Sequence, residues 1–177
     1  MDQERIALLK QHIRDVIDFP KPGIVFKDIS PLLANPAAFN TSLDLLAEHC
    51  DAQSFDTIVG IESRGFIFGA ALAAIMRKSF VPARKPGKLP AQTYRVEYEL
   101  EYGTDAIEIH CDAVSEGARV IVVDDLLATG GTAAATVQLL EKAGANVVGA
   151  AFVIELSFLQ GRERLAKLPV KSLISYA

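Results

Sequence analysis

Apolar residues near the start of the chain recur at spacings of three and four, the period of an amphipathic helix. This pattern predicts a helix over residues 2–18, with one face formed by Ile6, Leu9, Ile13, Val16 and Ile17. Three prolines and Gly23 follow within residues 19–31, so this segment is predicted as a shaped loop. Asn35, a good helix cap, and Pro36 predict the start of a second helix.

From residue 57 onward, short apolar runs alternate with helical segments. The predicted strands are residues 57–61, 80–83, 119–123 and 147–154, and the predicted helices are residues 66–76 and 131–143. The run Arg-Val-Ile-Val-Val at residues 119–123 is typical of a strand buried on both faces. Strand, helix and strand with short links form a βαβ unit, so the fold class is α/β, with a mainly parallel twisted sheet flanked by helices.

Between these units, the chain has a different rhythm. Residues 85–92 are polar and rich in proline and glycine, which predicts a hinged loop. Apolar and charged residues then alternate over residues 94–101, and the alternation returns at Ile107 and Ile109 after Gly103. This period of two predicts an antiparallel hairpin with one face in water.

Composition narrows the class of protein. A chain of 177 residues, half of them hydrophobic, suits one domain over residues 1–177. The net charge of −4 gives no general attraction to nucleic acid or to an anionic membrane, so neither is an expected partner. No apolar run reaches the roughly 20 residues of a membrane span. Only two cysteines are present, which suits a reducing cytoplasm.

The most informative segment is Val-Val-Asp-Asp-Leu-Leu-Ala-Thr-Gly-Gly-Thr at residues 122–132. Here a buried strand is predicted to end in two acids, before a turn of small residues enters a helix. Ligands of open α/β sheets lie beyond the carboxyl ends of strands, and a helix start favours an anion. We therefore predict a phosphate site formed by the backbone N–H groups of Ala128, Thr129, Gly130, Gly131 and Thr132. A side chain at Gly130 is expected to occupy the place of the phosphate. The alternative is an ordinary strand–turn–helix link.

The acids Asp124 and Asp125 have the same charge as a phosphate, so they are expected to bind something else. A pair of sugar hydroxyls suits them, either directly or through Mg²⁺, which proteins hold with few carboxylates and several waters. A phosphate site beside a diol site predicts a ribose phosphate as ligand. The segment has neither the Gly-Lys-Ser/Thr of a Walker loop nor the Gly-x-Gly-x-x-Gly of a dinucleotide site.

Residues 122–132 resemble the phosphoribosyl pyrophosphate motif of the type I phosphoribosyltransferases, and their sequence is similar to that motif in the adenine-specific branch. Three further segments resemble that branch in the same order along the chain. They are a base-covering hood at residues 19–31, a pyrophosphate loop at 60–66, and a flexible catalytic loop at 84–90 with 99–103. One departure is Pro86, where many members of the family have another basic residue.

The resemblance covers nearly the whole chain and implies the type I fold. It implies a small N-terminal hood over about residues 1–35 and an antiparallel hairpin lid over about residues 84–106. It places the pyrophosphate against Glu62, Ser63, Arg64, Arg84, Lys85 and Lys88, and it implies a cis-type peptide in the turn at 62–65. The base is placed against Val25, Phe26 and Lys27, with Leu126 as a further apolar cover.

Catalytic roles are also implied by the resemblance. Glu101 is the implied acid or base, Tyr102 lies beside it, and Arg64 assists at the pyrophosphate. From the residues alone, Glu101 is one more exposed acid on an alternating strand, and the basic cluster around Lys85 is a solvated run of charge.

The implied activity is transfer of the 5-phosphoribosyl group from phosphoribosyl pyrophosphate to N9 of adenine, giving AMP and pyrophosphate. Mg²⁺ is the implied cofactor, a homodimer the implied assembly and purine salvage the implied role. Two alternatives stay open. One is a sister enzyme that uses hypoxanthine, guanine or xanthine, and the other is a regulator that binds phosphoribosyl pyrophosphate without catalysis. The acidic balance counts against a nucleic-acid-binding regulator.

Overall fold

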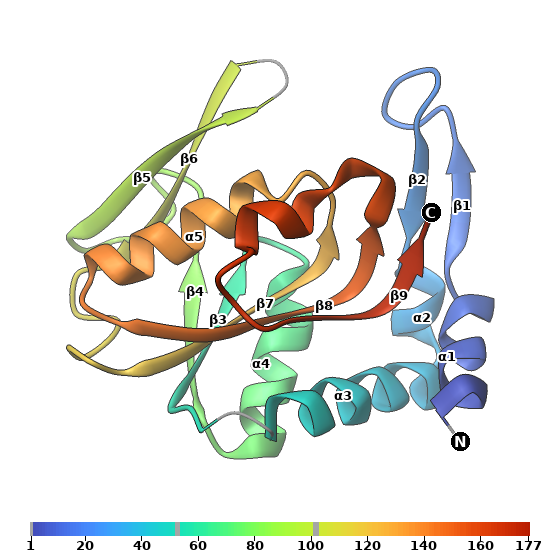
Figure 1. Ribbon diagram of the computed structural model, residues 1–177, viewed down its shortest axis with the longest axis horizontal. Helices are drawn as coiled ribbons and strands as arrows, with labels where there is room; N and C mark the ends of the chain where they lie inside the picture. The colour runs from blue at the N-terminus through green and yellow to red at the C-terminus, as the bar shows by residue number, and fades with distance from the viewer. Residues whose placement is uncertain (1, 52–53, 101–102) are drawn as a thin grey trace. The chain divides into compact units, whose positions relative to one another are not determined.

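The computed structural model describes residues 2–51, 54–100 and 103–177 (Figure 1). The chain divides into two compact units, Met1–Leu45 and Leu46–Ala177. The first unit contains the predicted hood, and the second contains the sheet. Among the described residues, none of the helices has both the length and the apolar character needed to cross a membrane.

The first unit consists of short elements around a hairpin. They are α1 (Asp2–Gln11), β1 (Arg14–Ile17), β2 (Val25–Asp28), α2 (Ser30–Ala34) and the start of α3 (Pro36–Asp51). The helix predicted over residues 2–18 is therefore wrong beyond Gln11. Residues 14–17 are extended because they pair antiparallel with β2, which supplies backbone partners that a helix would otherwise provide. The segment 19–31 is not only a loop, since it contains β2 and the first residues of α2.

The second predicted helix is confirmed as α3. Asn35 precedes it, and its Oδ1 accepts a hydrogen bond of 3.0 Å from the backbone N–H of Ala38. This is the capping bond that the sequence predicts at this position.

Two ion pairs cross the hairpin of the first unit at directly opposed positions. Arg14 faces Asp28 and Lys27 faces Asp15, with N–O distances of 2.5 Å and 2.6 Å. Asp28 also accepts a bond of 2.8 Å from the backbone N–H of Ser30. Hydrogen bonds from the side chain and backbone of Ser30, and then from Arg14, lower the pKa of Asp28 to about 2.

A pH dependence of the hood follows from this depressed pKa. The folded value of about 2 lies below the ordinary value of 3.8, so the carboxylate stabilises the hood above about pH 4. That contribution is lost as the pH falls towards 2. We expect amide exchange of β1 and β2 to accelerate over this window in the native protein. In Asp28→Asn the acceleration should be much weaker; an unchanged profile would contradict the assignment.

The second unit is built on a parallel sheet of five strands. Their spatial order is β4 (Ser79–Ala83), β3 (Thr57–Ile61), β7 (Arg119–Leu127), β8 (Asn146–Leu156) and β9 (Val170–Tyr176). Each neighbouring pair is parallel. The predicted class, α/β with a mainly parallel sheet, is confirmed. The central strands β3, β7 and β8 are buried along most of their length, as their apolar runs predict.

Helices cover both faces of this sheet (Figure 1). One is α4 (Gly65–Met76), which packs on β3, β4 and β7, and the other is α5 (Gly131–Lys142), which packs on β7 and β8. The core on the α5 side includes Val59, Val122, Leu139 and Phe152. Because the crossovers β3–α4–β4 and β7–α5–β8 link parallel strands, both helices start just after the carboxyl end of a strand.

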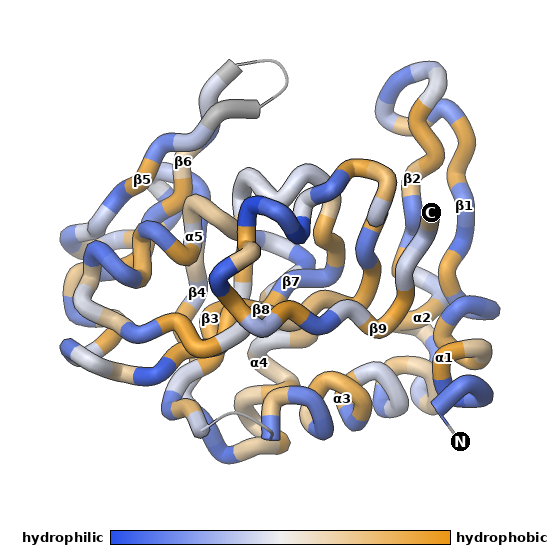
Figure 2. The backbone as a smooth tube through the Cα atoms, viewed as in Figure 1, coloured by the Kyte–Doolittle hydropathy of each residue, from blue (hydrophilic) through white to orange (hydrophobic). Residues whose placement is uncertain are grey.

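A separate antiparallel hairpin confirms the predicted hairpin. It consists of β5 (Thr93–Leu100) and β6 (Gly103–His110), and it extends beyond residue 106. Hydrophilic and hydrophobic residues alternate along it (Figure 2). Its apolar face includes Ile107 and Ile109, which are fully buried, and packs against α5.

Two short 3-10 helices and a final strand follow β8, and the pattern of residues did not predict them. They are η1 (Ser157–Leu159), η2 (Gly161–Leu165) and β9. β9 was missed because its burial is partial, with only Leu173 and Ile174 fully inside, as suits a strand at the edge of the sheet.

The two cysteines differ in environment. Cys50, in α3, is completely buried, and burial together with the nearby charge of Asp51 raises its pKa to about 12. Cys111 follows β6 at the base of the hairpin and is partly exposed. Both are free thiols.

Candidate active site

The predicted phosphate loop lies between β7 and α5. The strand continues to Leu127, so Asp124 and Asp125 lie within it and the prediction that the strand ends at these acids is wrong. Helix α5 begins at Gly131, and Gly130 has a φ of +77°, a conformation that favours glycine. A small cavity of about 90 Å³ is lined by Asp124 and by residues 126–133. The loop residues predicted to bind phosphate therefore line one hollow at a helix N-terminus.

The prediction that a side chain at Gly130 would occupy the place of the phosphate is wrong. A Cβ on Gly130 would lie 2.3 Å from the carbonyl oxygen of Gly161, so it would collide with the backbone of η2. It would not project into the place of a phosphate. Glycine is required here by the positive φ and by this close approach of two backbones.

Asp125, which is buried, and Arg64, which is half-buried, form an ion pair beside the loop. The Arg64 Nε and Asp125 Oδ2 atoms are 2.9 Å apart, and the Asp125 side chain is only 4% exposed. Burial raises the pKa of Asp124 and of Asp125, and the charge of Asp125 raises that of Asp124 further. Arg64 opposes the shift at both acids. Two carboxylates in a poorly solvated place favour the arrival of a cation or of hydroxyl donors.

The turn after β3 has the geometry that the resemblance implies. The peptide between Glu62 and Ser63 is cis, and α4 begins two residues later at Gly65. Glu62 does not face solvent. Its Oε2 atom accepts hydrogen bonds from Arg84 Nε at 3.2 Å and from the backbone N–H of Lys85 at 2.9 Å. The turn and the basic loop are therefore joined at Glu62.

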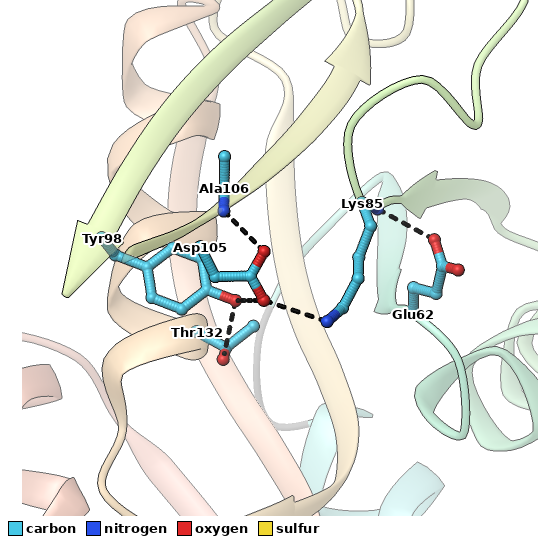
Figure 3. Close-up of polar contacts among 6 residues, drawn as sticks. All are labelled: Glu62, Lys85, Tyr98, Asp105, Ala106 and Thr132. Atoms are coloured by element: carbon cyan, nitrogen blue, oxygen red, sulfur yellow. Dashed lines mark hydrogen bonds and ion pairs between the residues drawn. The ribbon is translucent and has the colours of Figure 1, made fainter. Parts of the chain in front are cut away.

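A polar network connects the basic loop, the hairpin and the phosphate loop (Figure 3). Lys85 Nζ donates to Asp105 Oδ2 at 2.9 Å, and the hydroxyl of Tyr98 donates to the same oxygen at 3.3 Å. The hydroxyl of Thr132 in turn donates to that of Tyr98 at 3.2 Å. Lys85 therefore links the turn to the phosphate loop. Its backbone N–H bonds to Glu62, and its side chain is connected to Thr132 through Asp105 and Tyr98.

Sequence reasoning missed two members of this network. Neither Tyr98 nor Asp105 is singled out in the sequence analysis. Tyr98 and Asp105 are directly opposed in the hairpin. The signal was present in the alternation, since Asp105 is two residues before Ile107 and so shares the apolar face. An acid at an inward position needs a partner, and here the partners are Lys85 and Tyr98.

The remaining predicted residues are placed as follows. Lys88 is exposed, with its backbone carbonyl accepting a bond of 3.1 Å from Arg84. Val25, Phe26 and Lys27 lie on β2 in the first unit, where Phe26 packs edge-on against Phe19 at 5.2 Å between centroids. Glu101 and Tyr102 lie outside the described residues, so their catalytic roles stay predictions.

A permanent metal centre is not found within the described ranges. No group of three or more His, Cys, Asp or Glu side chains is suitably clustered there. Asp124 and Asp125 alone suit an ion that shares its coordination with water and with substrate oxygens, as Mg²⁺ usually does.

Comparison with known proteins identifies the family to which this fold and site belong. The family model for the phosphoribosyl transferase domain matches residues 28–173. The parallel sheet, the loop before α5 and the hairpin thus define the class as phosphoribosyltransferase.

Relatives narrow the class further. An adenine phosphoribosyltransferase of Sorangium cellulosum is 56% identical, over 99% of this chain and 90% of the relative. A solved adenine phosphoribosyltransferase from Thermoanaerobacter pseudethanolicus matches with a TM-score of 0.95 and 53% identity, over 97% of this chain and 99% of its own. The one from Saccharomyces cerevisiae, in complex with an imino-altritol bisphosphate and adenine, matches with a TM-score of 0.91 and 43% identity, over 97% and 99%. The chain belongs to the adenine phosphoribosyltransferase family.

Proposed function

We propose that this chain transfers the 5-phosphoribosyl group of phosphoribosyl pyrophosphate to N9 of adenine, forming AMP and pyrophosphate. The observation that carries the proposal is the loop of residues 128–132, which opens a helix N-terminus beside Asp124. This arrangement suits the 5-phosphate of a ribose. The adenine in the complexed yeast relative supports the choice of base.

The reaction is a displacement at the anomeric carbon of the ribose. The first turn of α5 has N–H groups without carbonyl partners inside the helix, and these bind the 5-phosphate. Asp124 and Asp125 accept hydrogen bonds from the ribose hydroxyls. Arg64, Arg84 and Lys85 neutralise the departing pyrophosphate, so charge that develops on the leaving group is stabilised. The hairpin excludes water, which would otherwise capture a ribosyl cation.

Mg²⁺ is proposed as the cofactor, held by Asp124 and Asp125 either directly or through the water-bridged contacts that are usual for this ion. When bound, it supplies positive charge to the pyrophosphate. The pairing of Asp125 with Arg64 means that one acid already has a cationic neighbour, and this leaves Asp124 as the stronger candidate for metal or ribose contact.

Formation of AMP is the direct test of this function. Purified protein is incubated with phosphoribosyl pyrophosphate, Mg²⁺ and one base at a time, and nucleotides are separated by chromatography. AMP from adenine supports the proposal. IMP or GMP formed in place of AMP would favour the sister enzyme, and binding of phosphoribosyl pyrophosphate without any nucleotide formation would favour the regulator.

A homodimer through α4 is proposed as the assembly. The twelve residues of α4 include no charged side chain, and Ile67 and Ile75 on its outer face are 40% and 54% exposed. Ala70 and Ala74 are also exposed on this helix. An apolar helix face of this kind is costly in water and suits a second copy of the same helix across a two-fold axis.

Loss of the dimer is the expected result of Ile75→Asp, because the charge would be buried at the interface without a partner. Sedimentation velocity should give a dimer for the native protein and a monomer for the variant. Arg77→Asp, just beyond α4, is the control for added negative charge and should remain dimeric. A monomeric native protein would contradict the assignment.

A cytoplasmic location is proposed because both cysteines are free thiols. Neither nucleic acid nor a membrane is proposed as a partner.

A further inference from the structure

The turn η2 lies directly against the phosphate loop, although it is far away in sequence. A Cβ on Gly161 would lie 2.1 Å from the carbonyl oxygen of Ala128 and 2.8 Å from the backbone nitrogen of Gly130. A Cβ on Gly130 would lie 2.3 Å from the carbonyl oxygen of Gly161. Real Cβ atoms are not found this close to backbone atoms. Each glycine is therefore required by the other.

This contact orients a peptide of the loop. The carbonyl oxygen of Ala128 faces Gly161, and the peptide that follows it is trans. In a trans peptide the C=O and the next N–H point in opposite directions. The N–H of Thr129 therefore points away from η2. The Ala128 carbonyl points towards η2 and so away from the side that this N–H faces, where it would repel a phosphate.

The turn itself is fixed to the sheet by the next residue. Arg162 donates from Nε and Nη2 to the carboxylate of Glu155 on β8, at 3.0 Å and 2.5 Å. It also donates from Nη1 to the carbonyl oxygen of Val170 on β9 at 2.7 Å. Glu155 is almost completely buried, and its bond to Arg162 lowers its pKa. A forked pair of this kind is rigid, so η2 has little freedom to recede from the loop.

We infer that Gly161 is a positioning residue for the phosphate site, and that the pair Arg162–Glu155 keeps it in place. The inference rests on the proposed function, in which residues 128–132 bind the 5-phosphate of the ribose. A methyl group at position 161 displaces the loop and misorients its N–H groups, while adenine recognition by the hood is not directly affected.

The test measures ribose 5-phosphate binding by calorimetry and the KM values of both substrates. Gly161 is not among the glycines with positive φ, so Gly161→Ala introduces the collision without backbone strain. We expect the Kd for ribose 5-phosphate and the KM for phosphoribosyl pyrophosphate to rise roughly 10–100-fold, the effect of a displacement on the order of 1 Å. The KM for adenine should change less than about twofold.

Gly117→Ala is the matched control. Gly117 has a φ of +75° and nothing within 4 Å of its Cβ position. The added methyl group therefore introduces backbone strain without a collision, at a site far from the loop. It should bind ribose 5-phosphate like the native protein. Arg162→Lys retains the charge but loses the fork, and it should raise the same Kd by a smaller factor.

Three outcomes decide the matter. A folded Gly161→Ala variant with native affinity for ribose 5-phosphate would overturn the inference. If that variant does not fold, unchanged affinity in both Arg162→Lys and Glu155→Gln would overturn it instead. A native protein that fails to bind ribose 5-phosphate at all would overturn the proposed function, and the inference with it.

Discussion

Adenine is expected to be used on the order of 10⁴-fold more efficiently than hypoxanthine or guanine, measured as kcat/KM. Adenine presents an N6 donor beside an N1 acceptor, whereas hypoxanthine presents an O6 acceptor beside an N1 donor. An extended strand presents C=O and N–H groups along its edge, and β2 is such a strand. If the base is enclosed against Val25, Phe26 and Lys27, the wrong base leaves buried polar groups unpaired, which is costly. Comparable efficiency with hypoxanthine would end the assignment of the base.

Lys27→Ala is expected to keep this preference, because the backbone and not the side chain is proposed to recognise the base. The Lys27 side chain is only 11% exposed, and its ammonium pairs with Asp15 across the hairpin. Asp15→Asn is the matched control, since it weakens the same ion pair and leaves Lys27 in place. Selectivity lost in Lys27→Ala but kept in Asp15→Asn would assign recognition to the side chain.

Turnover is expected to fall by roughly 10²–10⁴-fold in Glu101→Gln, the usual range for a general acid or base. Attack by N9 of adenine leaves a proton on the ring, and a carboxylate beside the imidazole edge accepts it or stabilises its charge. The amide retains the shape of the side chain but neither accepts a proton nor has a negative charge. Single-turnover kinetics isolate the chemical step, and substrate affinity should change much less than the rate.

The control for Glu101 is Glu97→Gln. Glu97 precedes Glu101 by four residues in the sequence, and its side chain is 66% exposed and paired with Arg95 at 2.8 Å. The same change of charge is thus made nearby in the sequence, at a residue without a proposed role, and near-native turnover is expected. Equal losses in both variants would point to a general effect of charge on the lid, and full activity in Glu101→Gln would return that residue to a solvated strand.

Much of the second unit could be predicted because its elements have strong local signals. The apolar runs of β3 and β7 have one physical explanation, which is burial on both faces. The alternation of β5 and β6 also has one, which is burial on a single face. The loop at residues 128–132 combines glycines with a strand and a helix, so its place was predictable too. The prediction failed at residues 14–17, where a helical spacing of apolar residues was outweighed by pairing with β2.

Contacts between distant segments were beyond reach of a local pattern. Nothing near Gly161 in sequence indicates that it meets Gly130, since that contact arises only when η2 folds back over the phosphate loop. The pairing of Arg64 with Asp125 joins the turn after β3 to the strand β7 in the same way. Asp105 is the intermediate case, because its inward position in the alternation marks it as unusual but does not name Lys85 as its partner.

The difference between the two thiols makes the hairpin accessible to spectroscopy. With a pKa of about 12, Cys50 has roughly one thiolate per 10⁵ molecules at pH 7, and its sulfur is enclosed by the core. A maleimide dye should therefore couple to Cys111, at the base of β6, in the unmodified chain. Its fluorescence would report rearrangement of the hairpin when phosphoribosyl pyrophosphate is added, without the introduction or removal of any cysteine.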